Sequence, residues 1–257
     1  MSVKLDGYST DSWQNYRSGS STGLPAGPIT VLRWLNRTAI DDAGNSITLN
    51  QLLVGTESNG MAVCRKSRIA SANFDRGIPT KLECTAYNLS THLDFPDNSI
   101  NDFEIDNRNR LWVATGRANI TQSGYGGIGV AVYNFSSEEW DWDWSEGGNS
   151  SDLLPFRVAE SGLPYDHVNS ITVTEDAKMW AGFSGWNKSL YESGNLPEHI
   201  ASFEVTGALG GTWRGGFHDV QNQYEPKCNV THIEFSRAST GVGDEKTYFT
   251  TECTGWD

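Results

Sequence analysis

The 257-residue sequence predicts an all-β fold built from repeated four-stranded units. Many short runs are rich in β-branched and aromatic residues, and glycine, asparagine and aspartate separate them. The same order of runs recurs along the chain, which indicates a repeat architecture. The 27 glycines suggest frequent turns, and the 10 tryptophans, 9 tyrosines and 10 phenylalanines argue against disorder, because disordered chains are poor in aromatic residues. Four-stranded units repeated in series are the blades of a β-propeller.

Each unit is expected to begin with an inner strand, and these strands start roughly 60 to 70 residues apart. The inner runs are residues 29–35, 100–105, 168–173 and 230–235. Second runs follow after polar turns, at residues 52–56, 111–115, 179–183 and 248–251. Small residues recur in them, at Gly55, Ala114 and Gly182. We expect a larger side chain there to crowd the neighbouring sheet.

Third and fourth strands complete the first three units. Third strands are predicted at residues 60–64, 129–133 and 199–203, and fourth strands at 81–84, 139–144 and 211–214. The run 139–144 alternates tryptophan with an acidic residue, which is typical of a half-buried strand.

The two ends of the chain predict how the ring of blades is completed. The last unit has only two strands, whereas residues 3–6 and 12–16 resemble a third and a fourth strand. Pairing these ends would remove exposed sheet edges. We therefore predict a single domain over residues 1–257 with four blades, at about 22–94, 95–160, 161–226, and 227–257 completed by 1–21. A piece of a longer propeller and an open array that shares half-blades between chains are the alternatives.

The four cysteines are predicted to form two disulfides. No pair has the C-x-x-C spacing of a structural zinc site. Strand placement favours the pairs Cys64–Cys84 and Cys228–Cys253 among the three pairings that four cysteines allow. Each bridge would stay within one blade.

Charge and sequons predict an extracellular or cell-surface glycoprotein. The net charge of -13 and the lack of a basic cluster argue against nucleic acid as a partner. No apolar run of 18 residues is present, so we expect no membrane insertion. Seven N-x-S/T sequons spread over the chain favour glycosylation. They are Asn36, Asn88, Asn119, Asn134, Asn149, Asn187 and Asn229.

The blade pattern resembles the two-component-regulator propeller repeat, which is common in extracellular sensor regions of bacterial hybrid histidine kinases. Residues 95–100 with 109–115 match its Leu-Pro-x-Asn-x-Val and Leu-Trp-Val-Gly-Thr segments, as do residues 162–168 with 178–182. Residues 23–25 with 53–56 match more loosely. The resemblance implies a propeller with a ligand-binding or interaction role. The resemblance does not imply signalling by this chain, because no kinase, transmembrane or effector segment follows in the sequence.

Ligand-binding residues are predicted in the loops that open the blades and in the long loops after the second strands. Aromatic rings beside amides and carboxylates suit sugar recognition, although such rings also pack between blades. The predicted residues are Asp97, Asn98, Arg117, Tyr125, Tyr165, Asp166, His167, Trp186 and Tyr191.

These features predict a binding module for a glycan or protein ligand. The alternatives are a polysaccharide lyase or hydrolase, and a structural subunit that self-associates through its terminal half-blades. No nucleophile elbow, P-loop or dinucleotide fingerprint is present. No cofactor is expected, and calcium is the one ion that the acidic turns at 41–45, at 106–109 and around Asp152 suggest, although none matches an EF-hand.

Overall fold

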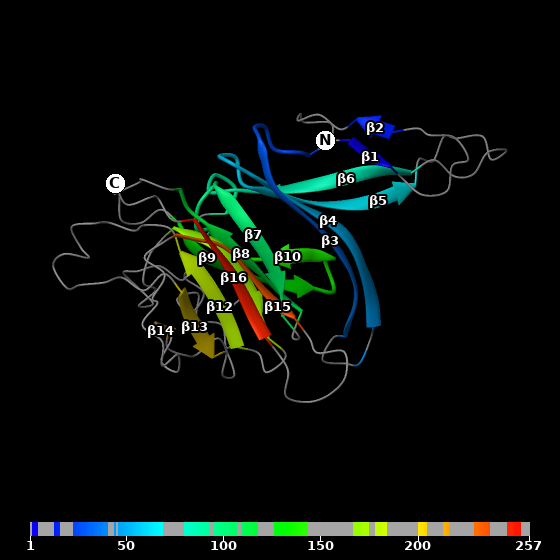
Figure 1. Cartoon of the computed structure of the whole chain (residues 1–257). Helices are drawn as coiled ribbons and strands as arrows, with labels where there is room; N and C mark the ends of the chain where they lie inside the picture. The colour runs from blue at the N-terminus through cyan, green and yellow to red at the C-terminus, as the bar shows by residue number, and fades with distance from the viewer. Residues whose placement is uncertain are drawn as a thin grey trace.

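A computed structural model of the chain shows sixteen β-strands in the part that it describes (Figure 1). The strands form three four-stranded antiparallel sheets and two two-stranded sheets. This confirms the all-β prediction and its four-stranded units. The described residues are 2–4, 13–15, 23–40, 44, 46–68, 80–92, 95–106, 109–117, 126–142, 167–174, 178–183, 200–204, 213–215, 229–236 and 246–252.

The three four-stranded sheets, called blades 1 to 3, each order their strands as they follow in the chain. Blade 1 contains β3 (Ile29–Ile40), β4 (Ser46–Thr56), β5 (Met61–Arg68) and β6 (Thr80–Tyr87). Blade 2 contains β7 (Ile100–Ile105), β8 (Arg110–Thr115), β9 (Gly127–Asn134) and β10 (Glu139–Asp141). Blade 3 contains β11 (Val168–Val173), β12 (Lys178–Phe183), β13 (Ile200–Glu204) and β14 (Trp213–Gly215).

The two remaining sheets are single hairpins. β15 (Asn229–Ser236) pairs with β16 (Lys246–Glu252), and we call this hairpin blade 4. β1 (Ser2–Lys4) pairs with β2 (Trp13–Asn15). Within the described residues the two hairpins do not pair with each other, and Figure 1 shows them apart. Closure of blade 4 by the N-terminal strands and the predicted blade limits therefore stay predictions.

The first hairpin is longer than the sequence pattern indicated. β3 and β4 stay paired as far as Ile40 and Ser46, beyond the predicted runs. Leu35, Ala39 and Leu49 are buried along this extension and belong to the core between blades 1 and 2. Apolar packing therefore continues the hairpin past the end of the repeat motif.

Every inner strand carries a register shift at the same place. In β3 the shift falls between Ile29 and Val31, and the other three inner strands repeat it at their own starts. A bulge leaves one residue outside the ladder and re-aims its side chain. The bulge residues are Thr30, Asn101, Asn169 and Thr231.

The first three bulge residues bond to the next blade. Thr30 Oγ1 donates to the Ile100 carbonyl. Asn101 Nδ2 donates to the Val168 carbonyl at 2.7 Å, and Asn169 Nδ2 donates to the Val230 carbonyl at 2.7 Å. Each acceptor is the first β-branched residue of the following inner strand. The same kind of side-chain to backbone hydrogen bond therefore joins neighbouring blades at three junctions.

A second set of bonds runs beside the first. Asp102 Oδ2 accepts hydrogen bonds from Ser170 Oγ at 2.7 Å and from the Ile171 amide at 3.0 Å. Ser170 Oγ in turn accepts a bond from the Ile233 amide at 3.0 Å. Burial raises the pKa of Asp102, and the bonds from Ser170 and Ile171 oppose that rise. These contacts link blades 2, 3 and 4.

Small residues in the second strands make room for the next blade, as predicted. A Cβ added to Gly55 would lie 2.7 Å from Ile100 Cγ2, and one added to Gly182 would lie 2.5 Å from Val230 Cγ1. Both distances are closer than carbon atoms pack.

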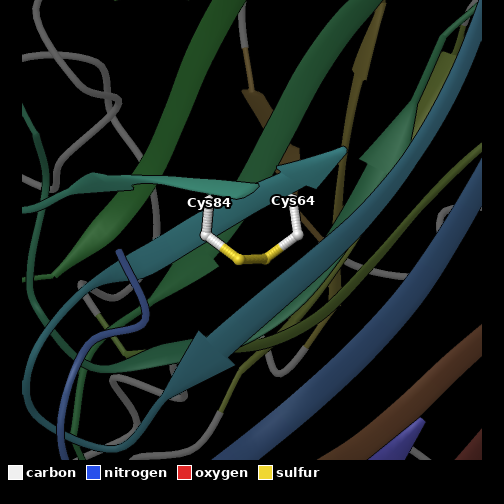
Figure 2. Close-up of a disulfide and its surroundings, with 2 residues drawn as sticks. All are labelled: Cys64 and Cys84. Carbon is white, nitrogen blue, oxygen red and sulfur yellow. A yellow bond between two sulfur atoms is a disulfide. The ribbon is translucent and has the colours of Figure 1, made fainter. Parts of the chain in front are cut away.

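The disulfide Cys64–Cys84 joins β5 to β6, which confirms the first predicted pair (Figure 2). The two residues are directly opposite in the antiparallel register, with Cα atoms 4.0 Å apart. Cys228 and Cys253 lie outside the described residues, so their pairing stays a prediction. Among the described residues no helix is long and apolar enough to cross a membrane.

Removing the disulfide should destabilise the protein measurably. The bond closes a loop with a sequence separation of 20 residues, for which loop entropy gives about 3 kcal/mol. We expect the double variant C64A/C84A to lose about that much unfolding free energy in guanidinium denaturation. Reductant should lower the stability of the wild type by more than that of the variant, in which only the predicted Cys228–Cys253 bridge is left to reduce. Equal stability of the two oxidised proteins would contradict the expectation.

Removing the Asp102 carboxylate should weaken the junction between blades 2 and 3. Asp102→Ala leaves the buried Ser170 hydroxyl and the Ile171 amide without this acceptor, so we expect a loss of about 1–3 kcal/mol of unfolding free energy. Glu57→Ala, at an exposed carboxylate of the turn between β4 and β5, is the matched control and should change stability by less than about 0.5 kcal/mol.

Candidate functional site

The structure describes four of the nine predicted ligand-binding residues: Asp97, Asn98, Arg117 and His167. Tyr125, Tyr165, Asp166, Trp186 and Tyr191 lie outside the described residues.

Asp97 and Asn98 hold the loop that opens blade 2. The buried Asp97 carboxylate accepts the Ser99 amide at 2.8 Å. Asn98 Oδ1 accepts the Leu89 amide at 2.9 Å, and its carbonyl accepts the Gly60 amide at 2.8 Å. These bonds give both residues a structural role, because they fix the turn and tie it to blade 1.

Arg117 directly follows Gly116 in the chain, and His167 directly precedes Val168. The backbone carbonyls of Gly116 and Val168 both accept hydrogen bonds from the Asn101 side chain. Asn101 Nδ2 donates to the Gly116 carbonyl at 2.9 Å and to the Val168 carbonyl at 2.7 Å. One side-chain amide therefore holds Gly116, the residue after β8, near Val168, the first residue of β11. Arg117 is exposed and His167 is half-buried. Burial lowers the pKa of His167 to about 4, so its ring is neutral at pH 7.

A pocket of about 250 Å³ lies at the outer edge of blade 2. Three segments form it: the loop after β6 that contains His92, the turn between β9 and β10, and β10 with the residue after it. Its lining residues are His92, Asn134, Ser137, Glu139, Trp140, Asp141 and Trp142.

Local turn chemistry positions the first wall of the pocket. Asn88 Oδ1 accepts the Ser90 and Thr91 amides at 2.9 and 3.1 Å, and the Asn88 carbonyl accepts the His92 amide at 2.8 Å. Asparagine forms such turns readily. The His92 ring lies 5.0 Å from the Tyr87 ring, measured between centroids. The turn and this ring contact fix the imidazole at the pocket.

A tight hairpin turn positions the opposite wall. Asn134 Oδ1 accepts the Ser136 and Ser137 amides at 2.9 and 3.2 Å. Glu138 has a φ of 57°, in the left-handed region. The turn then delivers Glu139 opposite Asn134 in the β9–β10 register, so an amide and a carboxylate lie side by side.

The alternation that predicted a strand at residues 139–144 separates a polar face from a buried one. Successive strand residues point to opposite faces, which places Glu139 and Asp141 together. Trp140 and Trp142 are buried in the core between blades 1 and 2. Trp140 Nε1 donates to Gln51 Oε1 of β4 at 2.9 Å. Residues of both faces thus line the pocket: the two nearly fully buried indoles and the acidic side chains, which supply acceptors.

Sequence reasoning missed this pocket. The alternation of tryptophan with acidic residues at 139–144 indicates a half-buried strand, and it does not indicate a pocket. In the structure Glu139 lines the pocket, whereas Glu138 lies 3.5 Å from Arg65 as an ion pair.

The described acidic groups do not form a metal site. Asp106 Oδ1 accepts the Arg110 amide at 2.9 Å, while Oδ2 accepts Arg110 Nε at 2.5 Å and Trp112 Nε1 at 3.0 Å. This carboxylate of the predicted calcium turn therefore faces donors. In the part of the chain that the structure describes, no group of three histidine, cysteine or acidic residues could hold a metal ion.

The predicted glycosylation sites differ in exposure. Asn36 and Asn134 are exposed, and Asn88 is half-buried with its Oδ1 bonded in the turn. Asn119, Asn149 and Asn187 lie outside the described residues, and Asn229 is described only as backbone in β15. Occupancy of these sequons stays a prediction.

A known protein family shares the repeat. The family described as "Two component regulator propeller" matches residues 94–117, so the chain carries this repeat across the loop that opens blade 2, β7 and β8. This confirms the resemblance read from the sequence. No curated protein matches the chain.

Two solved structures from B. thetaiotaomicron are similar to most of the chain. One is the extracellular domain of the putative one component system BT4673, with 12% identity and a TM-score of 0.28, covering 86% of this chain and 25% of that chain. The other is the extracellular domain of the putative hybrid two component system BT4673, with 13% identity and a TM-score of 0.25, covering 86% of this chain and 36% of that one.

The buried His167 should make stability depend on pH. A folded-state pKa of about 4 lies below the ordinary 6.5, so the unfolded chain binds the proton first. The contribution of the neutral His167 ring to the free energy of unfolding should be complete above pH 6.5. It should be lost as the pH drops towards 4, which lowers that free energy by on the order of 2 kcal/mol. Urea denaturation near pH 7 and near pH 4.5 measures this. His167→Gln should lose that part of the slope, whereas His232→Gln, at an exposed histidine, should keep it.

Proposed function

We propose that the chain is an extracytoplasmic β-propeller module that binds a small polyhydroxylated ligand, such as one sugar of a glycan, beside β10. The observation that carries this proposal is the pocket between the His92 loop and β10. It is hollow, its backbone is held by two asparagine turns, and its polar groups converge.

The chemistry of the lining matches a ligand with several hydroxyl groups. Glu139 and Asp141 supply carboxylate acceptors, and Asn134 and His92 add further polar groups. The buried tryptophans offer apolar edges. A volume of about 250 Å³ is below the roughly 300–1,000 Å³ typical for drug-sized ligands. One sugar ring suits that space better than an oligosaccharide.

The predicted location supports this ligand class. The Cys64–Cys84 disulfide is consistent with an extracytoplasmic protein, because such bonds persist in oxidising compartments. The similar solved structures are described as extracellular domains of one and two component systems. A ligand-sensing role for this chain would follow from that similarity. Arg117 and His167 stay predicted contacts at a separate place on the propeller.

Binding is favoured over hydrolysis by the placement of the carboxylates. Glu139 and Asp141 lie on the same face of one strand, two residues apart, which separates their Cβ atoms by about 7 Å. Glycosidases place two carboxyl groups on either side of the scissile bond. Side chains that project in parallel from one strand hold a ligand from one side only.

The proposal is tested by glycan-array screening followed by calorimetry on the best ligand. We expect Asp141→Asn and Glu139→Gln each to weaken binding about 10-fold or more, since a hydrogen bond to a charged group contributes about 1.5–3 kcal/mol. Glu57→Gln, which removes an exposed carboxylate from the turn between β4 and β5, should bind as the wild type does. An array with no bound glycan, or equal binding by all three variants, would contradict the proposal.

A further inference from the structure

The exposed large apolar side chains of the described residues all lie on one strand, β3. They are Ile29, Leu32, Trp34 and Ile40. β3 and β4 form one side of the molecule in Figure 1. A concentrated apolar patch on a soluble protein commonly marks an interaction surface.

The common bulge aligns the four inner strands and shows why this patch is exposed. Two positions after the bulge residue stand Leu32, Phe103, Ile171 and Ile233. Their exposed fractions are 51%, 0%, 1% and 2%. Phe103 is packed with residues of blade 1, Ile171 with residues of blade 2, and Ile233 with Trp180 of blade 3. Leu32 occupies the position that a preceding blade covers in every other case.

Blade 4 carries the residue that makes the other half of the contact between neighbouring blades. Thr231 is the bulge residue of blade 4 and is exposed. Its hydroxyl lies 3.2 Å from the Thr250 carbonyl and 3.0 Å from Thr250 Oγ1, within its own blade. Thr30, Asn101 and Asn169 instead reach the next inner strand. Thr231 is therefore the bulge residue whose hydroxyl is placed to donate to the inner strand of a following blade.

Blades 1 and 4 also carry side chains of opposite charge at matching strand positions. Arg33 of blade 1 forms a bidentate pair with Glu104 of blade 2, at 2.9 and 3.0 Å. The residue at the same strand position in blade 4 is the exposed Glu234. A blade 4 placed against β3 would bring this carboxylate towards Arg33.

We propose that blade 4 of one molecule packs on β3 of a second copy of this chain, and so repeats between molecules the contact that joins neighbouring blades within one. Thr231 donates to the Ile29 carbonyl of the other copy, and Leu32 and Trp34 become buried. β15 packs on β11 and β12 within its own chain and Leu32 is exposed. A second copy supplies a blade 4 whose Thr231 and Glu234 stand at the strand positions that would meet Ile29 and Arg33. Such a head-to-tail contact closes a ring of two copies or extends into a longer assembly.

The test is the oligomeric state of the whole chain, measured by sedimentation and light scattering over a range of concentrations. We expect the wild type to form dimers or larger species. Leu32→Asp should weaken association at least 10-fold. Ile40→Asp is the matched control, because Ile40 is an equally exposed apolar residue of β3 that lies beyond the length of β15. It should associate as the wild type does.

Two changes at the other end separate docking from folding. Glu234→Arg sets like charges against Arg33 and should weaken association several-fold, although residue 234 is exposed and far from Leu32 in sequence. Thr250 stands at the position of β16 that matches Gly55 and Gly182 in blades 1 and 3. Thr250→Gly removes its side chain and should strengthen association. A wild type that stays monomeric at high concentration, or association unchanged by both Leu32→Asp and Glu234→Arg, would overturn the proposal.

Discussion

The contact between one inner strand and the next is the interaction on which the structure depends. A four-stranded sheet has two faces, and an apolar face exposed to water is unfavourable. Each bulge releases one side chain, and in blades 1 to 3 that side chain bonds to the first β-branched residue of the following inner strand. At two of the three junctions the second strand carries glycine, Gly55 or Gly182, because a Cβ there would meet the incoming Ile100 or Val230; the junction between blades 2 and 3 carries Ala114. Hydrogen bonding and close packing are therefore satisfied at one place.

Much of this arrangement follows from the sequence. Strand order, the small residues of the second strands and the Cys64–Cys84 bridge were all predicted, because each depends on local pattern or on strands that are near neighbours. The bulges were not predicted, since Thr30 and Asn101 look like ordinary strand residues. Their role appears only when the partner strand, roughly 70 residues away, is placed beside them.

The pocket escaped prediction for a related reason. His92 and Asp141 are far apart in sequence and come together because blade 2 packs against the end of blade 1. Conversely, Asp97 and Asn98 were predicted as ligand contacts, yet their oxygens hold backbone amides. Asparagine and aspartate suit turns and ligand sites equally well, so residue type alone does not separate the two roles. Arg117, in contrast, is exposed, and within the described residues its side chain makes no comparable structural hydrogen bond.

The bonds between blades join immediate neighbours only, and this has a consequence for how the protein comes apart. A series of units coupled to their nearest neighbours behaves as a one-dimensional cooperative system, in which an interior unit is supported from two sides and a terminal unit from one. Among the described sheets, we therefore expect opening to begin at the two-stranded hairpin of β15 and β16 and at the side of blade 1 that carries the exposed Leu32. Backbone amides of β7, β8, β11 and β12 exchange with solvent last, and the Cys64–Cys84 clamp delays the loss of the outer strands at the N-terminal end.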